Sequence, residues 1–273
     1  MPHAVLPRNR LIMIPVVAAA AAISALSVAA PAAAQTSSVH YVALGDSYAS
    51  GVGAGDESGS CDQSPNAFST LWTNANDPAS YSFEACDGAT TSGIISSQIS
   101  ALSASTTLVS LTAGGNDVGF SSVMETCNEY FFSTSTCVNA VDQAESEIAN
   151  ELPGALNTLL ADIKAHAPNA KVVFLGYPDL YDLSKSSSCV GLSTTDRTDL
   201  NQGADQLDAQ IKAATARYGD TFVDVRPYFA GHEICDSSSW LNSVELFDLH
   251  TSYHPTATGQ EDGYLPAFTS AAG

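Results

Sequence analysis

Short apolar runs, each ended by small or polar residues, alternate along this chain with longer stretches in which apolar residues recur at three- and four-residue steps. The short runs are typical of buried strands and the longer stretches of helices packed on one face. The pattern therefore predicts strands, with 81–86 the weakest of them, at residues 41–44, 81–86, 107–112, 171–176 and 221–225.

Helical periodicity covers residues 138–166, where Pro153-Gly154 is a place at which the helix could break. A second helix is predicted from Asp196, as N-cap, to about Tyr218, and a third after Pro255. Strands that alternate with helices predict an α/β fold with a parallel sheet covered on both faces. The segments with neither pattern are expected to be long surface loops that help to build a site, namely 56–66, 125–137 and 178–195.

The N-terminus has the composition of a secretory signal. Arg8 and Arg10 precede an almost wholly apolar stretch, 11–30, which ends in the small residues 31–34. A membrane anchor is the alternative, but the alanine-rich composition and the small-x-small ending favour cleavage after Ala34. We therefore expect a signal peptide at 1–34, a single secreted domain at 35–273, and an extracellular location.

Charge and cysteines narrow the class of protein. The net charge of −20 argues against nucleic acid as a partner, because its phosphates would be repelled. All six cysteines follow the signal, and in an exported chain an even number indicates disulfides, with fifteen possible pairings. The simplest is sequential. A zinc site is disfavoured because no Cys-x-x-Cys pair is present.

The strongest local signal is Gly45-Asp46-Ser47-Tyr48, directly after the first predicted strand. A serine where a strand hands over to a helix lies at the carboxyl edge of the sheet, near unpaired helix N–H groups. Those donors could stabilise an oxyanion beside an attacking serine hydroxyl. The alternative is that Ser47 only caps the helix.

Two further glycine-containing turns follow the second and third strands. They are Cys86–Thr90, which contains Gly88, and Gly114–Asp117, which contains Asn116. In a parallel sheet both turns lie on the same edge as Ser47. Gly88 could offer an unobstructed backbone N–H and Asn116 a side-chain amide donor. Each turn alone is more often an ordinary tight turn, but together they predict an oxyanion site.

A serine nucleophile needs a base, and His254 is the strongest candidate because Pro255 fixes the backbone beside it. His250 could compete with it. A metal pair of the two histidines is disfavoured, since the His-Glu-x-x-His glutamate is absent and Pro255 argues against one continuous helix. Surface or packing roles are expected for His40, His166 and His232.

Taken together, these blocks resemble the GDSL/SGNH hydrolases, with Tyr48 where leucine is usual. The resemblance is closest to secreted bacterial lipases and esterases with a Ser–His dyad and three disulfides. It implies a three-layer flavodoxin-like fold with strand order 2-1-3-4-5, Ser47 as nucleophile, and an oxyanion hole from the Ser47 and Gly88 N–H groups and the Asn116 side chain. It also implies the sequential pairing Cys61–Cys86, Cys127–Cys137 and Cys189–Cys235.

One departure concerns the group that orients the histidine. The family usually carries aspartate three residues before the histidine, but this chain has Thr251. What the imidazole requires is an acceptor for its Nδ1–H. The Thr251 backbone carbonyl is the expected acceptor, and the carboxylate of Asp248 is the rival. Asp46 and Asp117 are read as turn and cap residues.

The sequence thus predicts a secreted serine esterase or lipase that cleaves carboxylic esters of lipids through an acyl-Ser47 intermediate, without a metal or cofactor. A monomer that touches lipid interfaces transiently is expected. The alternatives are a carbohydrate deacetylase of the acetylxylan type and a non-enzymatic ligand-binding module. Aromatic loop residues either form an acyl-chain groove or pack against the core, namely Phe120, Tyr130, Phe131, Phe132 and Tyr181.

Overall fold

The computed structural model describes residues 1–4, 38–127, 133–185, 189, 192–244 and 249–273. The chain divides into two units, Met1–Gln35 and Thr36–Gly273, and only the second is described in any length. The predicted signal peptide and its cleavage point after Ala34 fall in the first unit, almost wholly outside the described residues. They stay a prediction.

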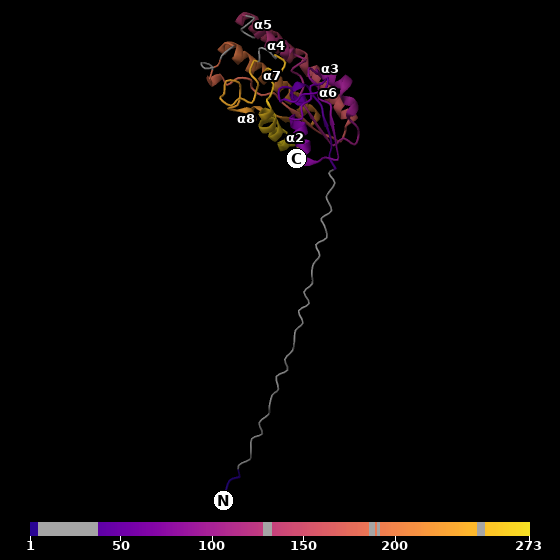
Figure 1. Ribbon diagram of the computed structural model, residues 1–273. Coiled ribbons are helices and arrows are strands. Elements are labelled where there is room, and N and C mark those ends of the chain that lie inside the picture. The colour runs from indigo at the N-terminus through magenta and orange to yellow at the C-terminus, as the bar shows by residue number, and fades with distance from the viewer. Residues whose placement is uncertain (5–37, 128–132, 186–188, 190–191, 245–248) are drawn as a thin grey trace. The chain divides into compact units, whose positions relative to one another are not determined.

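A parallel sheet forms the centre of the second unit (Figure 1). In the described residues it has five strands in the order β2-β1-β3-β4-β5, which confirms the expected α/β fold and strand order. All five predicted strands are present, with small shifts at their ends: β1 (His40–Ala43), β2 (Ser80–Phe83), β3 (Leu108–Leu111), β4 (Lys171–Leu175) and β5 (Thr221–Val223). Because every strand runs the same way, the turns after β1, β2 and β3 meet at one edge.

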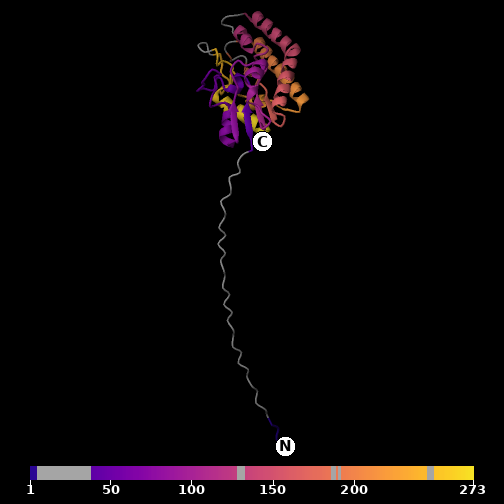
Figure 2. The same ribbon diagram turned by 90° about the vertical axis from the view of Figure 1, so that its right-hand side faces the viewer.

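Helices cover both faces of this sheet. In the described residues they are α1 (Ser47–Ser50), α2 (Phe68–Asn76), α3 (Thr91–Ser97), α4 (Phe120–Cys127), α5 (Thr134–Asn150), α6 (Leu152–His166), α7 (Thr194–Tyr218), α8 (Arg226–Phe229) and α9 (Leu265–Ala272). Short 3-10 turns lie at Ile99–Ala101 and Leu183–Lys185, and a π-helical turn at Gly259–Tyr264. Figures 1 and 2 show α3, α6 and α7 grouped together, away from α2 and the yellow C-terminal helix α9.

Aromatic packing joins the sheet to the α2 and α9 layer. The Tyr41 ring of β1 lies 5.3 Å from Trp72 and 5.5 Å from Phe268, and Phe68 stacks on Tyr264 at 5.6 Å. All five side chains are buried. Full burial of a large apolar side chain contributes about 1.5–3 kcal/mol, so this cluster anchors the C-terminal segment that carries His254 against the first strand.

Three details correct the expectations for the helices. The predicted 138–166 stretch divides into α5 and α6 at Glu151, close to the expected break at Pro153-Gly154, but α5 begins earlier than predicted, at Thr134. The N-cap of α7 is Ser193, and Asp196 is the third helical residue, which accepts from the Ser193 backbone in a capping box. The segment 125–137 is helical at both ends, with residues 128–132 outside the described part.

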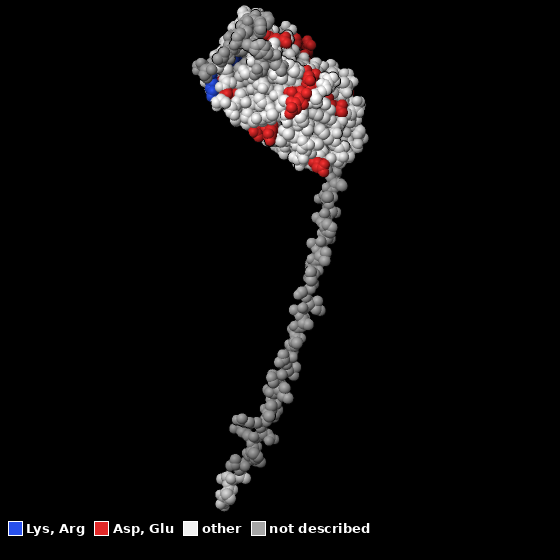
Figure 3. All heavy atoms as spheres, in the orientation of Figure 1, with Lys and Arg blue, Asp and Glu red and all other residues white. Residues whose placement is uncertain are grey.

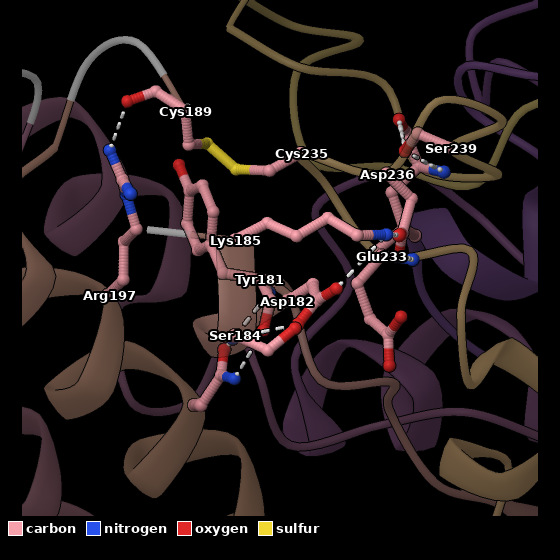
Figure 4. Close-up of a disulfide and its surroundings, with 12 residues drawn as sticks. Tyr181, Asp182, Ser184, Lys185, Cys189, Arg197, Glu233, Cys235, Asp236 and Ser239 are labelled. Atoms are coloured by element: carbon pink, nitrogen blue, oxygen red, sulfur yellow. Dashed lines mark hydrogen bonds and ion pairs between the residues drawn. A yellow bond between two sulfur atoms is a disulfide. The ribbon is translucent and has the colours of Figure 1, made fainter. Parts of the chain in front are cut away.

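The structure joins Cys61 to Cys86, Cys127 to Cys137 and Cys189 to Cys235. The first disulfide ties the loop after α1 to the turn after β2, and the second joins α4 to α5. The third joins the loop after β4 to the loop after α8, beside Tyr181 and Lys185 (Figure 4). Lys185 forms ion pairs with Asp182 and Asp236 there, so charge pairs and a covalent bond hold this corner together.

Carboxylates are scattered over the face shown in Figure 3, where one small group of basic side chains is visible at the left edge. This agrees with the net charge of −20. Among the helices of the described residues, none is both long and apolar enough to span a bilayer.

Candidate active site

Ser47 is the first residue of α1, and its position follows from the turn before it. Gly45 has φ +130° and leads β1 into that turn. A Cβ on Gly45 would lie 2.7 Å from the Thr112 carbonyl oxygen, so only glycine allows the turn to approach the end of β3. Asp46, not Ser47, caps the helix by accepting from the Tyr48 N–H at 3.1 Å. The Ser47 hydroxyl is therefore free for another partner.

That partner is His254. The Nε2 atom of His254 lies 2.8 Å from the Ser47 Oγ, although 207 residues separate the two in the chain. Both residues are 7% exposed. On the other side of the ring, Nδ1 lies 3.0 Å from the Ser252 carbonyl oxygen. Because a carbonyl oxygen only accepts, Nδ1 carries the proton, and Nε2 is left as the acceptor that a serine proton needs.

The carbonyl within hydrogen-bond distance of Nδ1 is that of Ser252, one residue beyond the expected Thr251, and a backbone hydrogen bond from Thr251 also raises the pKa of His254. Tyr253 has φ +67°, a left-handed conformation that turns the Ser252 carbonyl toward the ring. The Thr251 carbonyl also accepts from the His254 backbone N–H at 3.3 Å. Asp248, the rival orienting residue, lies outside the described residues. A backbone carbonyl was the expected type of acceptor, but sequence could not foresee the left-handed residue.

Burial dominates the electrostatics of the imidazole. Desolvation lowers the pKa of His254 to about 4, and the hydrogen bond to the Ser252 carbonyl opposes this only in part. The imidazole is consequently neutral at pH 7, which is the state that accepts a proton.

The loop that carries His254 is held against the nucleophile by Asn242. Its backbone N–H donates to the His254 carbonyl at 2.9 Å, and its carbonyl accepts from the Tyr253 N–H at 2.9 Å. The Asn242 side chain also donates to the carbonyl of Gly53, just beyond α1, at 3.1 Å. A Cβ on Gly53 would lie 2.5 Å from that side-chain nitrogen, so glycine is required for this approach.

The predicted oxyanion donors lie around the same site. Asn116 lines an apolar pocket together with Ser47. One N–H of its side chain donates to the Ala89 carbonyl at 3.1 Å, which ties the third turn to the second and leaves the other N–H unassigned. Gly88 is exposed, has φ +69° and lines a second pocket together with His254. Asp117 accepts from the N–H of Thr91, the first residue of α3, at 2.9 Å, although the N-cap of that helix is Thr90.

A buried polar network behind Ser47 was not recognised from the sequence. Asp46 is 1% exposed and accepts from the Thr112 hydroxyl at 2.6 Å and from the Tyr177 hydroxyl. Tyr177 follows β4, and its hydroxyl accepts from the Gly115 N–H at 3.3 Å. Burial raises the pKa of Asp46 despite these hydrogen bonds. Asp46 thus connects the nucleophile turn to the Gly114–Asp117 turn, a role beyond the expected helix cap.

Two pockets meet at the Ser47–His254 pair. The first is a partly open pocket lined mainly by apolar side chains of α4, α5 and α7, with Ser47 and Asn116 among its polar lining residues. The second is more polar and contains His254, Gly88, Asp87 and Glu125. Of the aromatic loop residues, Phe120 lines both pockets, Tyr181 is buried, and Tyr130, Phe131 and Phe132 lie outside the described residues.

The other described histidines are engaged elsewhere. His232 stacks on Trp240 with 3.7 Å between the ring centroids, and His40 and His166 bond to nearby oxygens. His250 lies 3.4 Å from an Asp62 oxygen and 3.9 Å from an Asp87 oxygen on the surface. It does not compete with His254 for Ser47. In the described residues this trio alone could provide three ligands to a metal ion, and we assign it no role.

Comparisons with known proteins give concordant results. Residues 43–261 match the GDSL-like Lipase/Acylhydrolase family. The chain is 45% identical to Lipase 1 of Streptomyces coelicolor over 94% of this chain and 95% of the relative. It is similar in structure to phospholipase A1 from Streptomyces albidoflavus, with a TM-score of 0.82 and 47% identity over 85% of this chain and 98% of that one. An extracellular lipase from Streptomyces rimosus also has a TM-score of 0.82, with 43% identity over 85% of this chain and 99% of that one.

Proposed function

From the premise that this chain belongs to the GDSL-like lipase/acylhydrolase family, we propose a Ser47–His254 catalytic dyad that cleaves the carboxylic esters of lipids. The protein is a carboxylic ester hydrolase of the lipase and esterase type, so a purely ligand-binding module is no longer an alternative. The observation that carries the catalytic assignment is the 2.8 Å contact between Ser47 Oγ and His254 Nε2.

The reaction has two stages. In the first, His254 Nε2 takes the Ser47 proton while Oγ attacks the ester carbonyl, and the same nitrogen then protonates the departing alcohol, which leaves an acyl-enzyme. In the second, His254 removes a proton from water, which attacks the acyl carbon and releases the acid and the Ser47 hydroxyl. The Nδ1–H bond to the Ser252 carbonyl keeps the proton-accepting nitrogen directed at Ser47 throughout.

The negative charge on the carbonyl oxygen in each transition state requires donors. We assign this role to the backbone N–H groups of Ser47 and Gly88 and to the Asn116 side chain. Support comes from the placement of Ser47 at a helix N-terminus and of Asn116 beside it in one pocket. Loss of one such donor typically costs about 2.7–4 kcal/mol in transition-state stabilisation.

The two pockets suggest how a lipid ester is divided. The apolar pocket under Ser47 suits a hydrocarbon chain, because Val123, Ile148 and Leu207 among its lining residues offer no hydrogen bonds. The second pocket, with His254 in its wall, suits the alcohol part, because His254 must deliver a proton to the leaving oxygen. The names of the similar proteins, lipase and phospholipase A1, support lipid esters as the substrate class over acetylated carbohydrate.

We further propose that the protein is secreted after cleavage behind Ala34 and acts as a monomer. The similar protein from Streptomyces rimosus is an extracellular lipase, which supports secretion of this chain. Leu249 is 45% exposed and lies on the wall of the second pocket, which favours transient contact with a lipid surface.

The decisive experiment is Ser47→Ala, assayed with p-nitrophenyl esters and with phosphatidylcholine. Without the nucleophile, turnover should fall by at least about 10³-fold, and a fluorophosphonate probe should no longer label the protein. Ser69→Ala is the control, since Ser69 is equally buried but lies on α2. A folded Ser47→Ala protein that hydrolyses esters at the parent rate would rule out the proposed mechanism.

A further inference from the structure

Tyr48 stands where leucine is usual in the family and is 2% exposed. Its hydroxyl donates to the backbone carbonyl of Tyr253 at 2.7 Å. A leucine side chain has no donor and could not form this bond. The residue beside the nucleophile is therefore hydrogen-bonded to the residue beside the base, a connection that neither residue's position in the sequence reveals.

We propose that Tyr48 is the positioning residue that holds His254 in its proton-accepting pose. The inference rests on the proposed Ser47–His254 mechanism. Tyr48 also lines the apolar pocket, but in this proposal it contacts no reacting atom and acts on catalysis through the backbone and ring of the His254 loop.

The backbone that Tyr48 holds is strained. Tyr253 has φ +67°, and a non-glycine residue in the left-handed region costs about 1–3 kcal/mol and persists only when its surroundings enforce it. Three contacts do so here. The Tyr253 N–H donates to Asn242 at 2.9 Å, its carbonyl accepts from Tyr48, and its hydroxyl accepts from Tyr181 at 3.4 Å.

The strained turn is what places the orienting carbonyl. Ser252, directly before Tyr253, presents its carbonyl to His254 Nδ1 at 3.0 Å. If Tyr253 relaxed to an extended backbone, that carbonyl would rotate away and Nδ1 would lose its acceptor. The Tyr48 hydroxyl bond therefore acts on the tautomer and orientation of His254 through Tyr253, the residue directly before it.

The Tyr48 ring adds a second constraint. It lies 5.1 Å from the His254 ring, at an interplanar angle of 44°, and limits rotation of the imidazole away from Ser47. The backbone of Tyr48 is fixed on both sides, because its N–H donates to Asp46 at 3.1 Å and its carbonyl accepts from Gln260 at 2.9 Å. Tyr48 thus fixes the positions of both the nucleophile and the base relative to one rigid residue.

Electrostatics explain why uncharged groups must hold the His254 ring in place. Burial lowers the pKa of His254 to about 4, and no carboxylate of the described residues bonds to its ring. A hydrogen bond to a carboxylate is charge-assisted and roughly twice as strong as one to a neutral carbonyl, so the Ser252 carbonyl holds the ring more weakly. Burial and the nearby Asp46 raise the pKa of Tyr48 well above its usual value, so its hydroxyl remains protonated and donates at any working pH.

The test is Tyr48→Phe, which keeps the ring and removes the hydroxyl. Because a misplacement of about 1 Å can cost roughly 10²-fold in rate, we expect kcat to fall about 10- to 100-fold while KM changes less than about twofold. The rate of Ser47 phosphorylation by an organophosphate, which reports only the first chemical step, should fall in parallel. Incorporation of p-aminophenylalanine at position 48, which restores a donor on the same ring, should recover most of kcat.

Tyr218→Phe is the matched control, since the Tyr218 hydroxyl also donates to a backbone carbonyl, that of Asn157 at 2.9 Å, but joins α7 to α6. It should lower the melting temperature without changing kcat. A folded Tyr48→Phe enzyme with kcat within twofold of the parent would overturn the proposal, as would an equal loss of kcat in Tyr218→Phe.

Should Tyr48→Phe fail to fold, Tyr181→Phe loosens the same turn from its other side, and unchanged kcat there would count against the proposal. Ser47→Ala with full activity would instead mean that the underlying mechanism is wrong.

Discussion

Replacing Thr251 by aspartate would put a carboxylate three residues before His254, and its effect on the pH dependence can be calculated in advance. The pKa of His254 falls from 6.5 to about 4, which at about 1.36 kcal/mol per pKa unit amounts to roughly 3 kcal/mol against the imidazolium. Only neutral imidazole accepts the Ser47 proton, so kcat/KM of the parent should rise with pH through about 4 and stay level to neutral pH.

A carboxylate within about 4–6 Å stabilises the charged imidazole and raises its pKa by about 1–3 units. In the Thr251→Asp variant, the acid limb of the plot of kcat/KM against pH should therefore lie between about pH 5 and pH 7. A limb near pH 6 would make kcat/KM at pH 5 about tenfold lower than in the parent, because only about a tenth of the imidazole would be neutral. At pH 8 the two enzymes should differ little.

The assay is hydrolysis of p-nitrophenyl butyrate from pH 3.5 to 8, quenched into alkaline buffer so that the colour is read at one pH. Ser105→Asp adds the same charge on an exposed loop at the opposite edge of the sheet, before β3, and should leave the profile unchanged. A parent acid limb near pH 6.5 would show that burial does not control the imidazole. An unshifted limb in Thr251→Asp would show that position 251 does not act on it.

Two further outcomes follow from the pocket and the disulfides. Ala204→Phe adds a bulky side chain to the apolar pocket beside α5. Because each buried methylene contributes about 0.8 kcal/mol, decanoyl esters should lose far more of their kcat/KM than acetyl esters. An equal loss across the series would contradict the assignment of this pocket to the acyl chain. Replacing both Cys61 and Cys86 by serine removes a disulfide that closes a loop with a sequence separation of 25. The free energy of unfolding, measured in urea, should fall by about 3.5 kcal/mol. An unchanged free energy of unfolding would indicate that this disulfide does not constrain the unfolded chain.

The sheet could be read from the sequence because each strand is a local, nearly continuous apolar run. Residues 107–112 and 171–176 lie in the sheet centre, where burial on both faces leaves little polar signal to confuse the pattern. Helix ends were harder. Ser193 and Asp196 both have cap chemistry, and only the folded backbone decides which of them has the extended conformation of a cap.

Candidate site residues could be found where a motif follows a strand. Ser47, Gly88 and Asn116 each come after a predicted strand, and a parallel sheet brings such turns to one edge. Tyr177 also follows a strand, yet nothing in its local sequence indicates that its hydroxyl reaches Asp46, because that contact crosses 131 residues.

The sequence by itself determined the alternation of strands and helices, the serine at a strand-to-helix turn and a late histidine before proline, since each is encoded within a few neighbouring residues. Tertiary structure alone decided that Ser252 orients His254, because this depends on one left-handed residue at Tyr253. It also decided that Tyr48 holds that residue in place. The physical reason is that hydrogen-bond direction is fixed by backbone angles and by side chains distant in sequence, to which no local pattern of polarity responds.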